Sequence, residues 1–262
     1  MAEPAFHDFV VVVTGASTGL GRAIAVETAA QGARAVVVNY ASSAEEAQET
    51  VRQVQAQGAQ ALAVQGDVAS DDDCHRIAEA AKGFGRLDAL FNNAAVTMFA
   101  RHADLDAVSA EDFQRIYAVN VIGAFQMVRA CRALLEAAPQ PGAVVNTSSI
   151  ASVMGVGSSI PYAASKAALN TLTRALARAL APKIRVNAVL PGFIDTPWFS
   201  KALTPQQVIR QRENAAASAP LKVASTAEDI AASAVFLAGR ASRHVTGETL
   251  IVDAGRHLGP TP

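Results

Sequence analysis

Short runs of apolar, largely β-branched residues alternate with longer segments of helical periodicity along almost the whole chain. The runs predict about seven strands, at residues 9–14, 35–39, 61–65, 87–91, 143–147, 184–189 and 249–252. The intervening segments predict helices at residues 20–31, 44–57, 71–82, 110–137, 162–180 and 227–237. Strands that are apolar throughout and separated by helices indicate a parallel sheet covered on both faces. We therefore expect an α/β fold, a doubly wound, Rossmann-like sheet that binds ligands at the carboxyl ends of its strands.

The chain of 262 residues contains no recognisable linker, repeat or low-complexity segment, which predicts a single domain over residues 1–262. Only the segment at about 193–220 interrupts the alternation of strands and helices, so we expect it to form a lid over the substrate. This segment contains Pro197, Trp198 and Phe199, and its aromatic rings predict an apolar lining for the substrate site.

The composition favours a small-molecule substrate. A formal net charge of -1 gives no electrostatic reason to expect a nucleic acid partner. Two cysteines, Cys74 and Cys131, are too few for a disulfide framework and predict free thiols in a reducing compartment. No secretory signal is recognisable, and no apolar run approaches the length of a membrane span. We therefore expect a cytoplasmic protein with no membrane partner.

A glycine-rich turn follows the first predicted strand and opens the first predicted helix. After Thr14, the residues Gly15, Gly19 and Gly21 follow the spacing Gly-x-x-x-Gly-x-Gly. Glycines permit a tight turn and a close approach of the backbone to a pyrophosphate, and free N–H groups at the start of a helix attract phosphate oxygens. The strand–turn–helix context therefore predicts a dinucleotide-binding site rather than a glycine turn with a packing role alone.

Tyr162 and Lys166 are four residues apart in a predicted helix, so both side chains project from one face. A lysine ammonium beside a phenol favours the phenolate, and we expect it to lower the pKa of Tyr162 from about 10. Such a phenol can donate or accept the proton that accompanies hydride transfer. Ser149 follows the end of a predicted strand, where its hydroxyl can stabilise a developing oxyanion. Ser148 and Ser152 are close enough in sequence to do the same.

Together these motifs resemble the short-chain dehydrogenase/reductase family, and the resemblance covers nearly the whole chain. It is carried by the glycine turn and by Asp67-Val68, Asn92-Asn93-Ala94-Ala95, Asn120-Val121-Ile122-Gly123, Tyr162-Ala163-Ala164-Ser165-Lys166 and Pro191-Gly192. The spacing of the family selects Ser149 from the three serines. One departure is Ala95, which takes the place of a family glycine and is expected to bring a methyl group close to the cofactor ribose.

The resemblance implies an oxidoreductase that transfers a hydride between a nicotinamide cofactor and a carbonyl or secondary alcohol, with Tyr162 as general acid/base. It implies that Asn120 holds a water molecule linked to Lys166 and that Thr196 binds the nicotinamide carboxamide. Asp67 would face the adenine, or act as a cap beside the next helix. The residues expected to contact the cofactor are Gly15, Ser17, Thr18, Gly19, Leu20, Asn39, Tyr40, Ser42, Ser43, Asp67, Val68, Asn93, Ala94, Ala95, Tyr162, Lys166, Pro191, Gly192, Ile194 and Thr196.

The end of the second predicted strand favours NADP(H) over NAD(H). An acidic residue there would bind the ribose 2′-hydroxyl of NAD and repel a 2′-phosphate. Residues 39–43 contain no carboxylate, and Asn39, Ser42 and Ser43 can donate hydrogen bonds to phosphate oxygens. Thr18 argues the other way, because many NADP-preferring relatives carry a basic residue at that position. We expect NADP(H), with NAD(H) as the alternative.

Other functions fit parts of the pattern. Sugar-nucleotide epimerases and dehydratases share Tyr-x-x-x-Lys, but they usually have a longer chain and a Gly-x-x-Gly-x-x-Gly turn. A cofactor-sensing binding protein without enzymatic activity would use the same fold, although such proteins usually lose the tyrosine or the lysine. The five histidines lack ligand spacing, and a helix start explains the acidic run at residues 71–73, so no metal is predicted.

The family also implies a homo-oligomer, a tetramer or a dimer, formed partly through the predicted helices at 110–137 and 162–180. The sequence does not predict the substrate. Sugars, steroids, acyl-carrier thioesters and small ketones are all substrates of relatives with this catalytic set.

Overall fold

A computed structural model of the chain describes residues 5–196, 198 and 204–259. All the paired strands are parallel, in the order β3-β2-β1-β4-β5-β6-β7. The predicted α/β fold is confirmed, and each strand end lies within two residues of its predicted position. The strands are β1 (Val10–Val13), β2 (Ala35–Tyr40), β3 (Gln60–Gln65), β4 (Ala89–Asn92), β5 (Gly142–Thr147), β6 (Ile184–Pro191) and β7 (Thr249–Val252).

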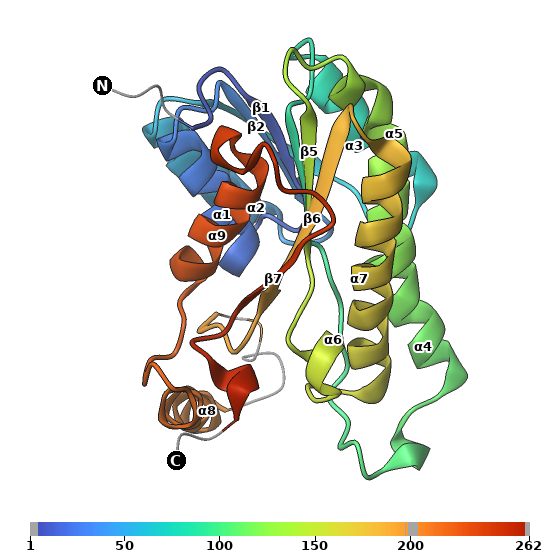
Figure 1. Cartoon of the computed structure of the whole chain (residues 1–262), viewed down its shortest axis with the longest axis vertical. Helices are drawn as coiled ribbons and strands as arrows, with labels where there is room; N and C mark the ends of the chain where they lie inside the picture. The colour runs from blue at the N-terminus through green and yellow to red at the C-terminus, as the bar shows by residue number, and fades with distance from the viewer. Residues whose placement is uncertain (1–4, 197, 199–203, 260–262) are drawn as a thin grey trace.

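Helices cover both faces of the sheet (Figure 1). On one face lie α1 (Gly19–Ala30), α2 (Ala44–Ala56) and α9 (Ala227–Ala238), and on the other lie α3 (Asp71–Lys82), α5 (Ala124–Glu136) and α7 (Ile160–Leu180). Val11 and Val13 belong to the apolar cluster on the first face, whereas Val10 and Val12 belong to the cluster on the second. Because successive strand residues point to opposite faces, burial on both sides requires strands that are apolar throughout.

The strand order reverses between β1 and β4, which places a crevice outside the carboxyl ends of these two strands. The carboxyl ends point toward the end of the molecule that carries α6 (Ala151–Met154) and α8 (Pro205–Ser218), the lower end in Figure 1. Short 3₁₀ turns complete the described elements: η1 (Leu105–Ala107), η4 (Arg240–Ser242) and η5 (Arg256–Leu258).

The predicted helix at 110–137 is interrupted. It comprises α4 (Ala110–Tyr117), a π-helical turn η2 (Ala118–Gly123) and α5. The run Ala110–Glu136 includes an 18-residue window of mean hydropathy 1.3, enough by length and composition to cross a membrane. The expectation that no run approaches this length was therefore wrong. In the fold this run packs against α3, α7 and the sheet, so it serves as a covering helix of the α/β sandwich.

The lid segment contains a helix that the sequence interpretation overlooked. Helix α8 begins with a capping box, in which the hydroxyl of Thr204 accepts from the backbone of Gln207 and the Gln207 side chain accepts from the backbone of Thr204. Pro205 occupies its first position, where a missing N–H has no cost. Among the residues of α8 only Ala215 is buried. The predicted contributions of Pro197 and Phe199 lie outside the described residues.

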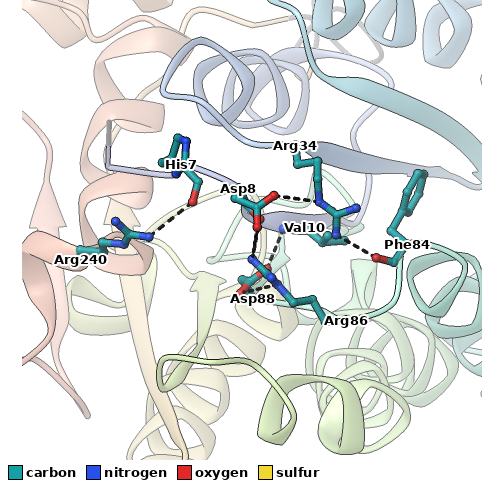
Figure 2. Close-up of polar contacts among 8 residues, drawn as sticks. All are labelled: His7, Asp8, Val10, Arg34, Phe84, Arg86, Asp88 and Arg240. Carbon is teal, nitrogen blue, oxygen red and sulfur yellow. Dashed lines mark hydrogen bonds and ion pairs between the residues drawn. The ribbon is translucent and has the colours of Figure 1, made fainter. Parts of the chain in front are cut away.

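A polar cluster joins the amino ends of three strands, at the edge of the sheet opposite the crevice (Figure 2). The carboxylate of Asp8 pairs with Arg34 at 3.1 Å and with Arg86 at 3.0 Å. Arg86 also pairs with the buried Asp88 at 2.9 Å, and Asp88 accepts a 2.8 Å hydrogen bond from the backbone of Val10. Since each charge has a partner within the cluster, these groups hold the strand starts together.

The two cysteines and the acidic run follow the sequence interpretation. Cys74 and Cys131 are free and buried, and burial raises the pKa of their thiols to about 11 and about 12. Ser70 caps α3 by accepting from the backbone of Asp73, so the acidic run occupies a helix start as expected. No group of three metal-ligating side chains gathers within the described part of the chain.

Candidate active site

A cavity of about 940 Å³ opens at the carboxyl edge of the sheet, at the ends of β1 and β4. It lies toward the upper end of the range of about 300–1,000 Å³ that is usual for ligand sites. Every residue predicted to contact the cofactor lines it, together with Ser149. Of the predicted site residues, only Asn120 is not part of the lining.

The turn after β1 requires its glycines. Gly15 and Gly19 have φ values of +60° and +55°, a backbone region that other residues rarely adopt. A Cβ atom on Gly15 would lie 2.9 Å from Cα of Ala94, and one on Gly21 would lie 2.3 Å from the carbonyl oxygen of Gly15. The loop after β4 and the first turn of α1 therefore both pack directly on the backbone of this turn.

Two side chains from β1 and β4 hold the turn in place. The amide of Asn93 donates to the carbonyl oxygens of Thr14 at 3.1 Å and Gly15 at 3.0 Å. In return, the hydroxyl of Thr14 accepts from the backbone N–H groups of Asn93 and Ala94, each at 3.0 Å. Thr14 is thus a site residue that the sequence interpretation used only as part of the motif. Ala95 is not among the described residues with positive φ, so its methyl group imposes no backbone strain.

The start of α1 fits a pyrophosphate. Thr18 occupies the N-cap position without a side-chain cap, and the first turn contains no acidic residue, so the backbone N–H groups face the cavity uncompensated. The guanidinium of Arg22 donates to the carbonyl oxygen of Ser17 and, at 3.0 Å, to the hydroxyl of Thr50. These two bonds fix the turn to α2.

The end of β2 is arranged differently from what we expected. Asn39 is only 1% exposed, and its amide donates to the carbonyl oxygens of Val64 and Gly66 at 3.3 and 3.0 Å. Its side-chain oxygen accepts from the backbone of Gly15. The expectation that Asn39 donates to a phosphate was therefore wrong, because its donors are used within the sheet. The hydroxyl groups of Ser42 and Ser43 still line the cavity.

Helix α7 brings Tyr162 and Lys166 to the same side of the cavity. Ser159 caps this helix by accepting from the backbone of Tyr162, which begins the first turn at the cavity wall. Lys166 Nζ lies 5.7 Å from the centroid of the Tyr162 ring and donates a 2.7 Å hydrogen bond to the carbonyl oxygen of Thr147 at the end of β5. The spacing of four residues thus produces the predicted juxtaposition.

The three neighbouring serines have different partners. Ser148 is buried and donates to the carbonyl oxygen of Lys166 at 3.1 Å, and Ser152 donates to the carbonyl oxygen of Ser149. Ser149 lines the cavity together with Tyr162, and its hydroxyl accepts a 3.1 Å hydrogen bond from the backbone of Ala151. Ser148 and Ser149 both line the cavity, but the hydroxyl of Ser148 is used by the carbonyl oxygen of Lys166, whereas Ser149 interacts with Tyr162.

Burial controls the acid–base properties of this pair. It raises the pKa of Tyr162 to about 12, although the interaction with the side chain of Ser149 acts in the opposite direction. It lowers the pKa of Lys166, which is 2% exposed, to about 7. The expected lowering of the Tyr162 pKa by the lysine was therefore wrong for the protein alone, because the cost of burying each charged form exceeds the attraction between them.

Asn120 has a different surrounding from the one that the resemblance implied. It is 1% exposed, and its side chain forms hydrogen bonds with both backbone groups of Val96, at 2.8 and 3.0 Å. Its amide also donates to the hydroxyl of Ser165 at 3.0 Å. The side chain therefore joins the loop after β4 to α7, and its polar atoms are occupied by the protein.

The substrate end of the cavity includes residues that sequence analysis missed. The ring of Trp198 lies 6.3 Å from that of Tyr162, consistent with an apolar lining from the lid segment. The other side chains there come from the loops after β4 and β5, from α8 and from the turn after β7. They are Phe99, Arg101, Val156, Gln211 and Arg256. No motif marks these positions, since they meet only through the topology of the sheet.

Comparison with known proteins agrees with this geometry. The profile of a family described as enoyl-(acyl carrier protein) reductase matches residues 15–257. A protein of Streptomyces violaceoruber, named as ketoacyl reductase 2 of the granaticin polyketide synthase, is 40% identical, and the alignment covers 98% of this chain and 100% of that protein. The chain belongs to the short-chain dehydrogenase/reductase family.

Other relatives place this short-chain dehydrogenase/reductase among oxidoreductases that bind a nicotinamide cofactor. An L-rhamnose 1-dehydrogenase (NAD(P)(+)) of Sphingomonas sp. strain SKA58 is 38% identical over 95% of this chain and 96% of its own length. The crystal structure of a short-chain dehydrogenase/reductase from Burkholderia xenovorans superposes with a TM-score of 0.88 at 37% identity, covering 96% of this chain and 99% of that one. The resemblance inferred from the motifs is thus confirmed.

Proposed function

We propose that this protein is an NADP(H)-dependent oxidoreductase that interconverts a carbonyl compound and the corresponding secondary alcohol, with Tyr162 as general acid/base. The observation that carries the proposal is the meeting of Tyr162, Ser149 and Lys166 in the same cavity as the glycine turn. The expected cytoplasmic location stays a prediction.

The proposed chemistry follows from these side chains. The cofactor supplies or accepts the hydride when it is bound. During reduction, the phenol of Tyr162 donates its proton to the carbonyl oxygen, and the hydroxyl of Ser149 donates a hydrogen bond to the same oxygen. A Tyr162 pKa of about 12 keeps the phenol protonated at neutral pH, which suits a proton donor. Lys166, held by Thr147, is positioned to restore the proton.

Three features support NADP(H) as the cofactor. The end of β2 presents no carboxylate to the cavity, and the hydroxyl groups of Ser42 and Ser43 line it. The side chain of Ser43, the N-cap residue of α2, makes no cap hydrogen bond, so the helix end does not fix the orientation of its hydroxyl. Hydroxyl donors without a carboxylate suit a 2′-phosphate better than a free 2′-hydroxyl. NAD(H) remains the alternative cofactor.

Turnover of a carbonyl panel tests the function. Oxidation of NADPH is followed with ketones and aldehydes of different size, using wild-type protein and Tyr162→Phe. We expect kcat of the variant to fall by about 10²- to 10⁴-fold, the usual contribution of general acid–base catalysis. Tyr117→Phe, on α4 and outside the cavity lining, is the matched control and should retain activity. Equal turnover by wild type and Tyr162→Phe would contradict the proposal.

We also propose that residues 193–220 act as a lid and that the protein assembles with copies of itself. Helix α8 is bound to the segment before it by the ion pair of Arg212 and Asp195 at 3.3 Å. Along the run of α4, η2 and α5, Phe113, Ile122 and Phe125 are 37%, 50% and 42% exposed. Large apolar side chains gathered on one helical layer support a protein interface there.

A further inference from the structure

Two arginines line the same cavity as Tyr162. Arg101 lies in the loop after β4, and Arg256 opens η5 after β7. Among the described residues that line the cavity, Asp67 is the one carboxylate. It follows β3 at the far edge of the sheet, whereas Tyr162 stands beside β5. The two arginines therefore face the cavity with no carboxylate among the described lining residues except Asp67.

Neither guanidinium has a hydrogen-bond or ion-pair partner within the described part of the chain. Other arginines of the protein are engaged: Arg86 pairs with two carboxylates, and Arg185 donates to several backbone carbonyl groups. A guanidinium presents a planar fork of donors that matches the oxygens of a carboxylate or phosphate. Two unpaired forks in one cavity are therefore suited to bind an anion.

Backbone contacts connect the loops of these two arginines to different parts of the cavity wall. Next to Arg101, the N–H of Ala100 donates to the carbonyl oxygen of Ser158 at 2.9 Å, just before α7 begins. Next to Arg256, a Cβ atom on Gly255 would lie 3.1 Å from Pro220 at the end of the lid segment. The loop of Arg101 is thus joined to the start of the helix that carries Tyr162, and the loop of Arg256 packs against Pro220.

Apolar side chains line the cavity between these charges. Phe99 is 42% exposed and Val156 is 45% exposed, and both line the same cavity as Trp198. Exposed apolar surface of this kind favours a ligand with a hydrocarbon body. A substrate that matches the whole lining would combine a carbonyl, an apolar chain and an anionic end.

We propose that the substrate is such a compound, a carbonyl joined through an apolar chain to a carboxylate or phosphate, and that Arg101 and Arg256 bind the anionic group. This inference rests on the proposed function and names the substrate class of the same site. It makes the two arginines specificity-determining residues, because a neutral analogue with the same carbonyl loses their interaction.

Binding can be measured without turnover. Trp198 is the single tryptophan of the chain, and its fluorescence reports occupancy beside Tyr162. Protein saturated with NADP⁺ is titrated with 5-oxohexanoate, 7-oxooctanoate and 9-oxodecanoate, each beside its methyl ester. 6-Oxoheptyl phosphate, compared with 7-hydroxyheptan-2-one, distinguishes a phosphate from a carboxylate. We expect at least one anion to bind about tenfold more tightly than its neutral partner.

Arg101→Gln and Arg256→Gln should each raise the Kd of the preferred anion about tenfold, the loss expected for one charge-assisted hydrogen bond. The Kd of the neutral partner should stay within about twofold. Arg210→Gln is the matched control, since Arg210 lies on α8 but does not line the cavity. The Kd of NADP⁺ should be unchanged in all three variants.

Absence of a preference for any anion, including absence of binding by every probe, would overturn the inference. It would also fail if Arg256→Gln weakened NADP⁺ binding while the ratio of anion to neutral Kd stayed constant, since the arginine would then serve the cofactor. Turnover of the neutral esters without an anion preference would leave the proposed function intact. An anion preference without reduction of any carbonyl would count against the proposed function alone.

Discussion

Lys166 Nζ donates a 2.7 Å hydrogen bond to the carbonyl oxygen of Thr147, and this bond anchors a buried amine at the end of β5. The bond compensates only part of the cost of removing the ammonium from water, because burial still lowers the pKa of Lys166 to about 7. The protein therefore keeps at its centre a group whose charged form destabilises the fold.

Replacing this lysine should stabilise the protein in a defined pH range. In the unfolded chain the amine has its ordinary pKa of 10.5, so the penalty in the folded protein develops as pH falls from 10.5 and is complete below about 7. A shift of this size corresponds to up to about 5 kcal/mol, less about 1 kcal/mol for the lost hydrogen bond. Urea unfolding of Lys166→Met should show a larger unfolding free energy than wild type at pH 6.

The gain should shrink as pH rises toward 10.5. Lys82→Met, which removes an exposed lysine of α3, controls for the change in net charge and should show no such gain. A difference between Lys166→Met and wild type that is the same at pH 6 and pH 10 would contradict the burial argument.

Cofactor preference should respond to a carboxylate placed at the end of β2. Ala41 is exposed and lines the cavity beside Ser42. A carboxylate at residue 41 would repel a 2′-phosphate and accept a hydrogen bond from a free 2′-hydroxyl. We expect Ala41→Asp to lower kcat/KM for NADPH at least about tenfold, equivalent to 1.4 kcal/mol, and to leave NADH unaffected or improved.

Ala41→Asn has nearly the same shape without the charge and serves as the control. Steady-state kinetics with both cofactors, at one carbonyl substrate, provide the comparison. If Ala41→Asp and Ala41→Asn lowered kcat/KM for NADPH equally, the effect would be steric and the charge argument would not hold.

Asn120 should act as a positioning residue. Asn120→Leu keeps the branched shape of the side chain but leaves the backbone groups of Val96 and the hydroxyl of Ser165 without this partner. The loss should reduce the unfolding free energy by about 2–4 kcal/mol and lower kcat more than it changes KM. An Asn120→Leu variant as stable as wild type would contradict the role of this side chain as a structural link.

The fold could be predicted from the sequence because the pattern of apolar strands and the positions of the turns that begin the helices agree. Strands such as β1 are apolar at every position, and α1 and α3 begin at recognisable turns. The break at η2 was not predicted from the periodicity; within it, Asn120 is hydrogen-bonded to Val96, 24 residues earlier, a contact that no local pattern indicates. Helix α8 was missed for a different reason. Its capping box of Thr204 and Gln207 is followed by mostly exposed residues, so the helix has no strong apolar pattern in the sequence.

The residues of the site could be predicted from the sequence only where a local spacing relates them. Tyr162 and Lys166 form a pair because four residues separate them on a helix. The inward orientation of Asn39 depends on β3 as its neighbour, and the convergence of Arg101 with Arg256 depends on strand order. The sequence also does not show how deeply a side chain is buried. The direction of the Tyr162 pKa shift was therefore mispredicted, because burial of the phenol raises its pKa.

Self-association should depend on the helical layer formed by α4, η2 and α5. This run carries a window of mean hydropathy 1.3 of which 39% is buried within one chain, and Phe113, Ile122 and Phe125 are exposed along it. Isolated apolar residues on a surface are ordinary, but several on one covering layer indicate a surface that a second copy buries. We expect sedimentation velocity to show a dimer or tetramer for wild type.

Phe125→Glu should shift the distribution toward a smaller species, because a carboxylate in an apolar interface is desolvated without a partner. Leu105→Glu is the matched control, since Leu105 lies in η1 and is 70% exposed outside this layer. An unchanged assembly in Phe125→Glu, or equal dissociation in both variants, would exclude this layer as the interface. Circular dichroism of each variant establishes that the fold is retained, so that a smaller species reflects a lost interface rather than unfolding.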